Sequence, residues 1–249
     1  MLRKAVVGFI AVVPFTALRV FLYRALLGYE IAPGGRIGMF NFINAGRLKM
    51  GRAAIGSFNL IDVGELVMDD GAAVSRFNRF KMFNRLQMGE RSVIRSNNTV
   101  FGTLPGISPF KGHEDMALGK DCIITNGHLF DLSDSVTFGD NVTVAGKESQ
   151  FWTHSFDFGH VKMQAPIAVD DDVYIGARSI ITPGVNITSR VSVGAGTTVS
   201  KSITEPGFYV SSSLVRKGDV PDYSAQGCVE RNGARFCRRK DRRDAEGGV

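Results

Sequence analysis

The sequence has few cysteines, which can crosslink a chain, and few prolines, which interrupt helices and strands. Its 249 residues include only three cysteines and eight prolines. Cys122, Cys228 and Cys237 form neither an even disulfide framework nor a CxxC metal pair. This excludes a disulfide-rich scaffold and makes a reducing compartment the simplest inference. With 29 glycines and few prolines, the composition suits many tight corners without disorder.

A long uncharged hydrophobic run is also missing. Residues 5–18 form an uncharged run of 14, shorter than the ~20 residues that a membrane-spanning helix needs. Arg19 and Arg24 interrupt the apolar residues that follow, and Pro14 would kink a helix through this region. The run is therefore too short to predict a spanning helix.

Basic residues outnumber acidic residues only at the two ends of the chain. The net charge is +6, and residues 216–249 carry nine Lys or Arg against six Asp or Glu. Residues 1–30 carry four basic residues against a single acidic one, Glu30. This asymmetry suggests an anionic surface near both termini, either phospholipid or a phosphorylated ligand, and no nucleic acid is expected as a partner.

What the sequence does have is a repeat with a strict period of six over residues 169–204. Val or Ile stands at every sixth position, and a second series of small or branched residues follows four positions later. The two series are Val169, Ile175, Ile181, Ile187, Val193, Val199 and Val173, Ser179, Val185, Val191, Thr197, Ile203. Neither a strand (period 2) nor a helix (period 3.6) explains this spacing. A hexapeptide repeat that builds a parallel β-helix does, with one strand and one corner per hexad and three hexads per coil.

The period is degraded over residues 37–100 and is broken twice further along. Residues 102–117 and 145–168 interrupt it and are expected to leave the prism as loops. In the early coils, four asparagines are expected at corners that need left-handed backbone angles: Asn78, Asn84, Asn97 and Asn98. The predicted organisation is an N-terminal helix (1–30), a β-helix domain (31–209) and a C-terminal extension with a basic tail (210–249).

The N-terminal segment has two interpretations. A cleavable signal peptide is disfavoured, because Arg3 and Lys4 precede an apolar core but no small-x-small cleavage site follows. We expect a helix that lies in the membrane interface with its arginines among the head groups. The alternative is a helix that caps the end of the prism, as any solenoid requires.

The strongest repeats and the segment before them resemble a known family. THSFD (153–157), API, DDDVYIGARSIITPGVNI and VSVGAGTTVSKSI resemble the hexapeptide-repeat O-acetyltransferases of maltose, galactosides, nodulation factors, capsule, colanic acid and O-antigen. The resemblance is specific from about Gln150 to Ser202 and only architectural before that. It implies a left-handed parallel β-helix, a homotrimer with active sites between neighbouring prisms, and acetyl-coenzyme A as the donor.

The resemblance also assigns roles to individual residues. His154 matches the general base, and Asp157 an acidic position that orients the acceptor or the histidine. Tyr174 stands where the family usually has a Trp that packs along the pantetheine arm. The other implied coenzyme contacts are Gly176, Ala177, Ser179, Ala195, Thr197 and Lys201, with Arg216 and Lys217 as further candidates for the phosphates.

Other candidate residues are weighed against simpler roles. Trp152, Asn126 and His160 are predicted acceptor contacts, although Trp152 is equally a lid on the prism and His160 is more simply a loop residue. His128 follows Asn126-Gly127 and is expected at a corner. A zinc site from His154, Asp157 and His160 lacks a readable second shell, so no metal is predicted.

These observations predict an acetyl-coenzyme A-dependent O-acetyltransferase. The expected acceptor is a sugar hydroxyl in surface polysaccharide, O-antigen or lipid-linked glycan, and the expected location is the cytoplasm, peripherally on the inner face of the plasma membrane. One alternative is N-acetylation of a nucleotide-linked amino sugar. Another is a non-catalytic shell like that of γ-carbonic anhydrases, which four scattered histidines fit poorly. The sequence also departs from the family at 210–217, where VSSSLVRK replaces a G-N-P-A-like ending.

Overall fold

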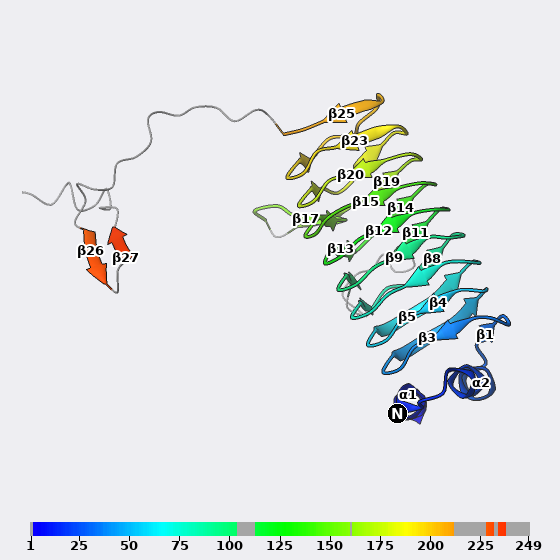
Figure 1. Ribbon diagram of the computed structural model, residues 1–249. Helices are drawn as coiled ribbons and strands as arrows, with labels where there is room; N and C mark the ends of the chain where they lie inside the picture. The colour runs from blue at the N-terminus through cyan, green and yellow to red at the C-terminus, as the bar shows by residue number, and fades with distance from the viewer. Residues whose placement is uncertain (1, 104–112, 160, 212–227, 232–233, 238–249) are drawn as a thin grey trace, which may run out of the picture. The chain divides into compact units, whose positions relative to one another are not determined.

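A computed structural model describes residues 2–103, 113–159, 161–211, 228–231 and 234–237. The chain divides into two units, Met1–Ser211 and Ser212–Val249. The first unit is the predicted all-β solenoid, a parallel β-helix preceded by two helices (Figure 1). In the second, β26 (Cys228–Arg231) and β27 (Ala234–Cys237) form an antiparallel hairpin.

The β-helix is a three-sided stack of parallel strands, and the chain visits its faces in the order 1, 2, 3. Face 1 consists of β2 (Arg36–Ile37), β4 (Ala54–Ile55), β6 (Ala73–Val74), β9 (Val93–Ile94), β12 (Ile123–Ile124), β15 (Thr143–Val144), β20 (Tyr174–Ile175), β23 (Val191–Val193) and β25 (Gly207–Tyr209). The strands are short because each hexad supplies only two or three residues before the chain turns a corner.

Faces 2 and 3 are joined in one sheet because two long strands, β3 (Phe42–Met50) and β5 (Leu60–Met68), run around the corner between them. Face 2 continues with β7 (Arg79–Lys81), β10 (Thr99–Gly102), β13 (Leu129–Leu132), β16 (Gln150–Trp152), β21 (Ile180–Ile181) and β24 (Thr198–Val199). Face 3 begins with β1 (Glu30–Ile31) and continues with β8 (Arg85–Met88), β11 (Asp115–Leu118), β14 (Val136–Phe138), β19 (Ile167–Val169) and β22 (Asn186–Ile187).

The residues that recur with a period of six point into this prism. All twelve residues of the two predicted series are at most 8% exposed, and the aliphatic ones form part of a continuous core. In the middle coils the core includes larger rings: Phe130 stacks on Phe151 at 4.6 Å between ring centroids. The hexad pattern therefore reports which side chains point inward.

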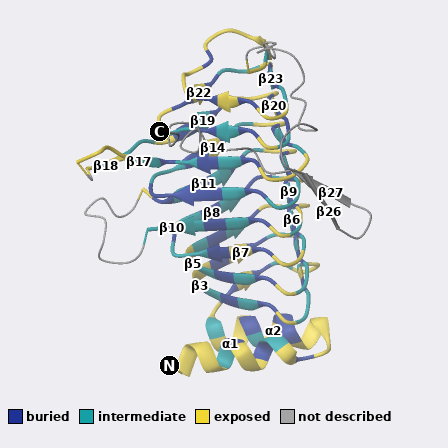
Figure 2. Cartoon of the chain, turned by 90° about the vertical axis from the view of Figure 1, so that its left-hand side faces the viewer, coloured by how far each residue is buried: buried dark blue, intermediate teal, exposed yellow. Residues whose placement is uncertain are grey.

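Two helices, rather than one, cover the first coil. α1 (Leu2–Val12) and α2 (Thr16–Leu27) are separated next to Pro14 and run across the end of the stack (Figures 1 and 2). Ile10 and Tyr23 are completely buried against the first strands. Arg19 is also buried, and its guanidinium donates to Ile37 O at 2.6 and 3.0 Å. The helices thus cap the prism, and among the described residues none is long and apolar enough to cross a membrane.

A buried polar column runs up the corner between faces 1 and 2. Each coil places one polar side chain immediately before its face 2 strand, and the column reads Asn41, Asn59, Asn78, Asn98, His128, Ser149, Ser179 and Thr197. The backbone N–H of each residue from Asn59 to Ser179 donates to the side chain one coil below, at 2.8–3.3 Å. These bonds satisfy groups that the corner would otherwise leave unpaired.

At the corner between faces 1 and 2, the left-handed positions lie one residue before this column. They are occupied by Phe40, Phe58, Phe77, Asn97, Gly127, Glu148, Arg178 and Gly196, all with φ between 57° and 70°. Of the four asparagines predicted there, only Asn97 is correct. Asn78 and Asn98 are instead in the buried column, where a carboxamide can both donate and accept. Asn84 has no positive φ, and its side chain donates to Asp115 Oδ1 at 2.7 Å.

Candidate functional site

The second break in the repeat forms a β-hairpin at the corner between faces 2 and 3. β17 (His154–Phe156) pairs with β18 (Lys162–Gln164) in antiparallel register, with His154 opposite Gln164. Figure 2 shows this hairpin standing out from the stack. Its base is fixed by the bond from Ala165 N to Thr153 O at 3.0 Å. A residue at the start of β17 is therefore held rigidly beside the prism wall.

His154 is oriented by a buried carboxylate, that of Asp131. The Nδ1 atom lies 2.6 Å from Asp131 Oδ2, and Asp131 is 1% exposed on β13. The same Oδ2 accepts bonds from Thr153 N and Thr153 Oγ1, each at 3.2 Å, and Oδ1 accepts from Ser133 Oγ at 3.2 Å. These bonds hold the carboxylate in one orientation against the imidazole.

This contact fixes which nitrogen of His154 carries the proton. A carboxylate only accepts, so Nδ1 is the N–H donor and Nε2 keeps its lone pair. Within the described residues, no hydrogen-bond partner contacts Nε2, and the His154 side chain is 20% exposed. The arrangement presents an oriented imidazole to a molecule arriving at the corner.

Aromatic rings surround the imidazole. Trp152 and Phe156 both meet it edge to face, with ring centroids at 6.1 and 5.4 Å. Phe101 packs against Trp152 in the same way at 6.5 Å, and the indole N–H of Trp152 donates to Gln150 Oε1 at 2.9 Å. These contacts restrict the imidazole ring to one orientation.

A polar cavity of about 490 Å³ lies beside the hairpin. Its lining is His113, Asp134, Ser135, Lys162, Gln164 and Pro166. Lys162 Nζ donates to Ser133 Oγ at 2.8 Å, and that hydroxyl is 3.1 Å from His154 Nδ1. The cavity therefore shares its wall with the groups that hold the imidazole.

The repeats beyond the hairpin match a known family model. Residues 166–201 match the model described as the hexapeptide repeat of succinyl-transferase. These residues are hexapeptide repeats. They build the last coils of the prism, directly above the hairpin that carries His154. No curated protein matches the sequence.

Solved structures of hexapeptide-repeat proteins are among the structural matches. A maltose O-acetyltransferase from Clostridium difficile 630 has 22% identity over 53% of this chain, with a TM-score of 0.28. The chain spans 64% of that protein, less than two thirds of its length. The polySia-specific acetyltransferase NeuO has 13% identity, with coverage of 80% of this chain and 93% of its own and a TM-score of 0.44. A hexapeptide-repeat-containing acetyltransferase from Vibrio cholerae O1 biovar eltor, complexed with acetyl-coenzyme A, has 18% identity, coverage of 84% and 82%, and a TM-score of 0.32.

The structure separates the other predicted acceptor residues. Asp157 is exposed at the hairpin turn, where its Oδ1 accepts the N–H of Val161 at 2.9 Å, so the partner of His154 is Asp131 instead. Asn126 lies at the corner between faces 1 and 2, where Oδ1 accepts Ser96 N at 3.1 Å. Trp152 is beside His154, whereas His160 lies outside the described residues.

The residues assigned to coenzyme A lie mostly at the corner between faces 1 and 2 of the hexapeptide repeats. Tyr174 is 48% exposed on face 1, and Ala177 and Ala195 stack one coil apart at the corner that follows. Ser179 and Thr197 point inward in the buried polar column, and Gly176 is buried. Lys201 is exposed after β24, near the corner of His154, and Arg216 and Lys217 lie outside the described residues.

Asp131 was missed from the sequence, although a signal was present. It stands between two buried residues of β13, at a position whose side chain faces outward, where the coil above contributes Trp152 in register. A carboxylate one coil below the Thr-His pair therefore indicates contact with it, once the coil length is known.

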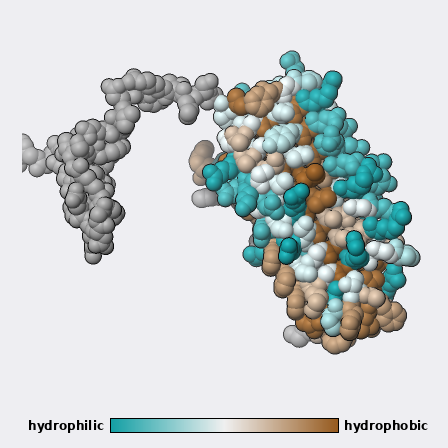
Figure 3. Space-filling view, viewed as in Figure 1, coloured by the Kyte–Doolittle hydropathy of each residue, from teal (hydrophilic) through white to brown (hydrophobic). Residues whose placement is uncertain are grey.

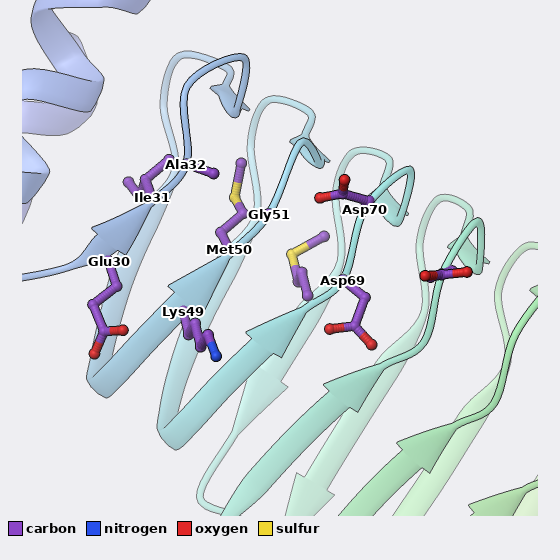
Figure 4. A pocket seen from close by; sticks show the side chains of 10 residues that line it. Glu30, Ile31, Ala32, Lys49, Met50, Gly51, Asp69 and Asp70 are labelled. Carbon is purple, nitrogen blue, oxygen red and sulfur yellow. The ribbon is translucent and has the colours of Figure 1, made fainter.

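A second groove lies on the first coils, away from the hairpin (Figure 4). It measures about 630 Å³ and is lined by Glu30, Ile31, Ala32, Lys49, Met50, Gly51, Met68, Asp69, Asp70 and Glu90. Three of its acids are already paired: Asp70 with Arg52 at 2.7 Å, Glu90 with Arg91 at 3.4 Å and Glu30 with Arg47 at 3.5 Å. The groove is acidic and shares no residue with the imidazole site.

Proposed function

We propose that the chain is an acetyltransferase that moves an acetyl group from acetyl-coenzyme A to a sugar hydroxyl in surface polysaccharide, O-antigen or lipid-linked glycan. The observation that carries this proposal is the pairing of His154 with Asp131 at 2.6 Å, with no hydrogen bond to Nε2 from the part of the chain that the structure describes, at the edge of a hexapeptide-repeat prism. Acyl transfer to a hydroxyl needs one oriented neutral base and a donor held close to it, and this corner supplies the base.

In the proposed step, His154 Nε2 accepts the proton of the acceptor hydroxyl as its oxygen forms a bond to the thioester carbonyl carbon. When the carbon–sulfur bond breaks, His154 returns that proton to the departing thiolate. Asp131 stays ionised throughout and stabilises the imidazolium that exists between the two transfers. This division of labour matches the general logic of carboxylate–histidine pairs in acyl transfer.

The surroundings of His154 favour a saccharide acceptor. Five of the six residues that line the adjoining cavity have polar side chains, and two of them, Lys162 and Gln164, carry N–H groups that can donate to hydroxyls. Trp152 offers a ring face or edge next to the imidazole, and sugar rings have apolar faces that pack on aromatic side chains. For Asp157 we propose contact with the acceptor, since its exposed carboxylate lies on the same hairpin.

The position of the coenzyme residues supports assembly of the site between copies. In one chain, Tyr174 and Ala177 lie at the corner between faces 1 and 2, whereas His154 lies at the corner between faces 2 and 3. The small side chains at Ala177 and Ala195 leave room for a pantetheine arm along that corner. We propose a homotrimer in which this corner of one prism faces the hairpin of its neighbour, in the cytoplasm where acetyl-coenzyme A is available.

The test is an acceptor screen with three variants. Purified protein is incubated with labelled acetyl-coenzyme A and polymeric, polyprenyl-linked or nucleotide-linked acceptors, and the products are mapped by mass spectrometry. His154→Ala is expected to lower kcat by ~10²–10⁴-fold. Asp131→Asn is expected to lower kcat, and Asp157→Asn to raise KM for the acceptor with kcat kept.

Each outcome decides a separate part of the proposal. Near-normal turnover of His154→Ala would remove the proposed base. Acetylation confined to nucleotide-linked amino sugars would replace the O-acetyltransferase with the N-acetyltransferase. A monomer in light scattering that retains full activity would contradict the shared site.

A further inference from the structure

The two N-terminal helices carry an apolar face that the prism does not use. Seven large hydrophobic side chains of this region are 45–82% exposed: Leu2, Phe9, Val12, Phe15, Leu18, Phe21 and Leu26. Figure 2 shows both helices with extensive exposed surface at the end of the stack, and Figure 3 shows brown, hydrophobic surface gathered at the same end. An apolar patch of this kind on a monomer surface marks an interaction site.

Capping alone does not account for this outer face. The inner face already covers the first coil with Val7, Ile10, Val20 and Tyr23, all 8% exposed or less. A solenoid cap needs an apolar side toward the repeats and a polar side toward water, because the outer side must stay soluble. Here the outer side repeats the chemistry of the inner one, so it is built for a second partner.

The charges around the patch indicate the chemistry of that partner. Residues 2–29 contain no Asp or Glu, and Arg3, Lys4 and Arg24 are exposed residues. The guanidinium groups of Arg3 and Arg24 also donate to Ala45 O and Ile31 O at the rim of the cap. The fourth basic residue, Arg19, is buried against backbone carbonyls and contributes to the fold. Aromatic and aliphatic side chains flanked by basic residues, without acids, are the composition of helices that lie in the interface of an anionic bilayer.

We propose that the outer face of α1 and α2 binds the surface of an anionic lipid bilayer, with both helices in the plane of the interface. The helices have 11 and 12 residues, a length of about 16–18 Å each, which suits insertion among head groups and upper acyl chains. A second copy is a poorer occupant. Two caps face to face would bring the basic residues of both copies together with no acid from residues 2–29 to pair with them.

This proposal is tested on the full chain by co-sedimentation with vesicles. One set contains phosphatidylcholine with 30% phosphatidylglycerol, and the other contains phosphatidylcholine alone. The protein is expected to bind the anionic set at least tenfold more tightly, and less tightly at 1 M than at 0.1 M salt. Equal binding to both sets, or binding to neither, would overturn the proposal without any variant.

Variants then locate the contact. Phe9→Ser with Phe21→Ser is expected to weaken binding at least tenfold, because two apolar side chains are lost from the interface. Lys4→Glu is expected to weaken it about fivefold. The matched control is Phe208→Ser, which removes a ring that is 72% exposed at the opposite end of the prism and should leave binding unchanged.

Two further measurements separate this proposal from its rivals. In lipid-free buffer, a wild-type mass that is twice the mass of the Phe9→Ser/Phe21→Ser variant would identify a second copy of the protein as the occupant of the apolar face. Unchanged vesicle binding by that variant would also refute the assignment. Asp131→Asn, which is expected to impair acetyl transfer, should bind vesicles like the wild type, so the two proposals fail independently.

Discussion

Replacing His128 with asparagine should make the fold resistant to mild acid. His128 is the one titratable member of the buried polar column, in the position that Asn98 occupies one coil below. Its Nδ1 accepts the N–H of Ser149 at 3.1 Å, and its Nε2 is 2.9 Å from Thr125 Oγ1. An asparagine Oδ1 can accept the Ser149 N–H in the same way, so His128→Asn extends the asparagine column by one coil.

The expected size of the effect follows from the burial of the imidazole. Burial lowers the pKa of His128 from 6.5 to about 4, because the site cannot solvate the charged ring. The unfolded chain therefore binds this proton at a higher pH than the folded chain. Stability is complete above pH 6.5, falls as the pH drops from about 6.5 to about 4, and then levels off. The loss is at most about 3 kcal/mol at pH 4.

Thermal unfolding followed by circular dichroism from pH 7.5 to pH 4 measures this loss. In a unit of about 200 residues, ~3 kcal/mol corresponds to a shift in Tm of about 6–12 °C. His128→Asn should reduce the acid-induced fall in Tm by that amount, with a Tm near the wild-type value at pH 7.5. His113→Asn, at an exposed histidine, is the control and should behave like the wild type. Equal acid sensitivity of His128→Asn and wild type would refute the reasoning.

Other expected outcomes concern the column and the stacking of coils. Asn98→Ala should cost about 1–3 kcal/mol in the free energy of unfolding, because the His128 N–H loses its acceptor at 2.9 Å. Asn97→Gly next to it should instead stabilise the fold by up to ~1 kcal/mol, since Asn97 has φ 64°. A Tm that falls equally in both would contradict the column. Gly176→Ala should lower the Tm strongly, because its Cβ would lie 2.5 Å from Ala195 N. Gly127→Ala, with open space and φ 68°, should cost only about 1 kcal/mol, which chemical denaturation can check.

The architecture was predictable because burial in a prism imposes a period that no other element shares. From Val169 onward one aliphatic residue per hexad is enough to identify the inward side chains. In the early coils the spacing varies, since corners accept an extra residue without disturbing the stack. There the face 1 residues Ile37, Ile55, Val74 and Ile94 are 18, 19 and 20 residues apart, so the pattern was visible but blurred.

The predictions that are wrong concern asparagine, a residue type that has two structural roles in this fold. Asparagine suits both a left-handed corner and a buried ladder, and the sequence alone did not separate Asn97 from Asn98. The left-handed positions below them are filled by Phe58 and Phe77, whose rings stack at 5.1 Å, a choice that backbone preference would not predict.

The candidate site was predictable in part for a related reason. The Thr-His pair stood out by its resemblance to known sequences, whereas Asp131 is 23 residues away along the chain and meets it only through stacking. Contacts between coils depend on the exact length of each coil, and the hairpin adds residues that belong to none. The resemblance points to Asp157, three residues after His154, whereas the carboxylate that contacts the imidazole in the structure is that of Asp131.

The two ends of the prism are not equivalent. The first coil is sealed by α1 and α2, whereas within residues 2–211 the last rung, β25, has a paired strand on one side only. New rungs can therefore be templated at the final coil but not at the first. Engineered extension with additional hexads should succeed after Tyr209, the end of β25, and the length of the molecule can grow there without disturbing the imidazole corner below.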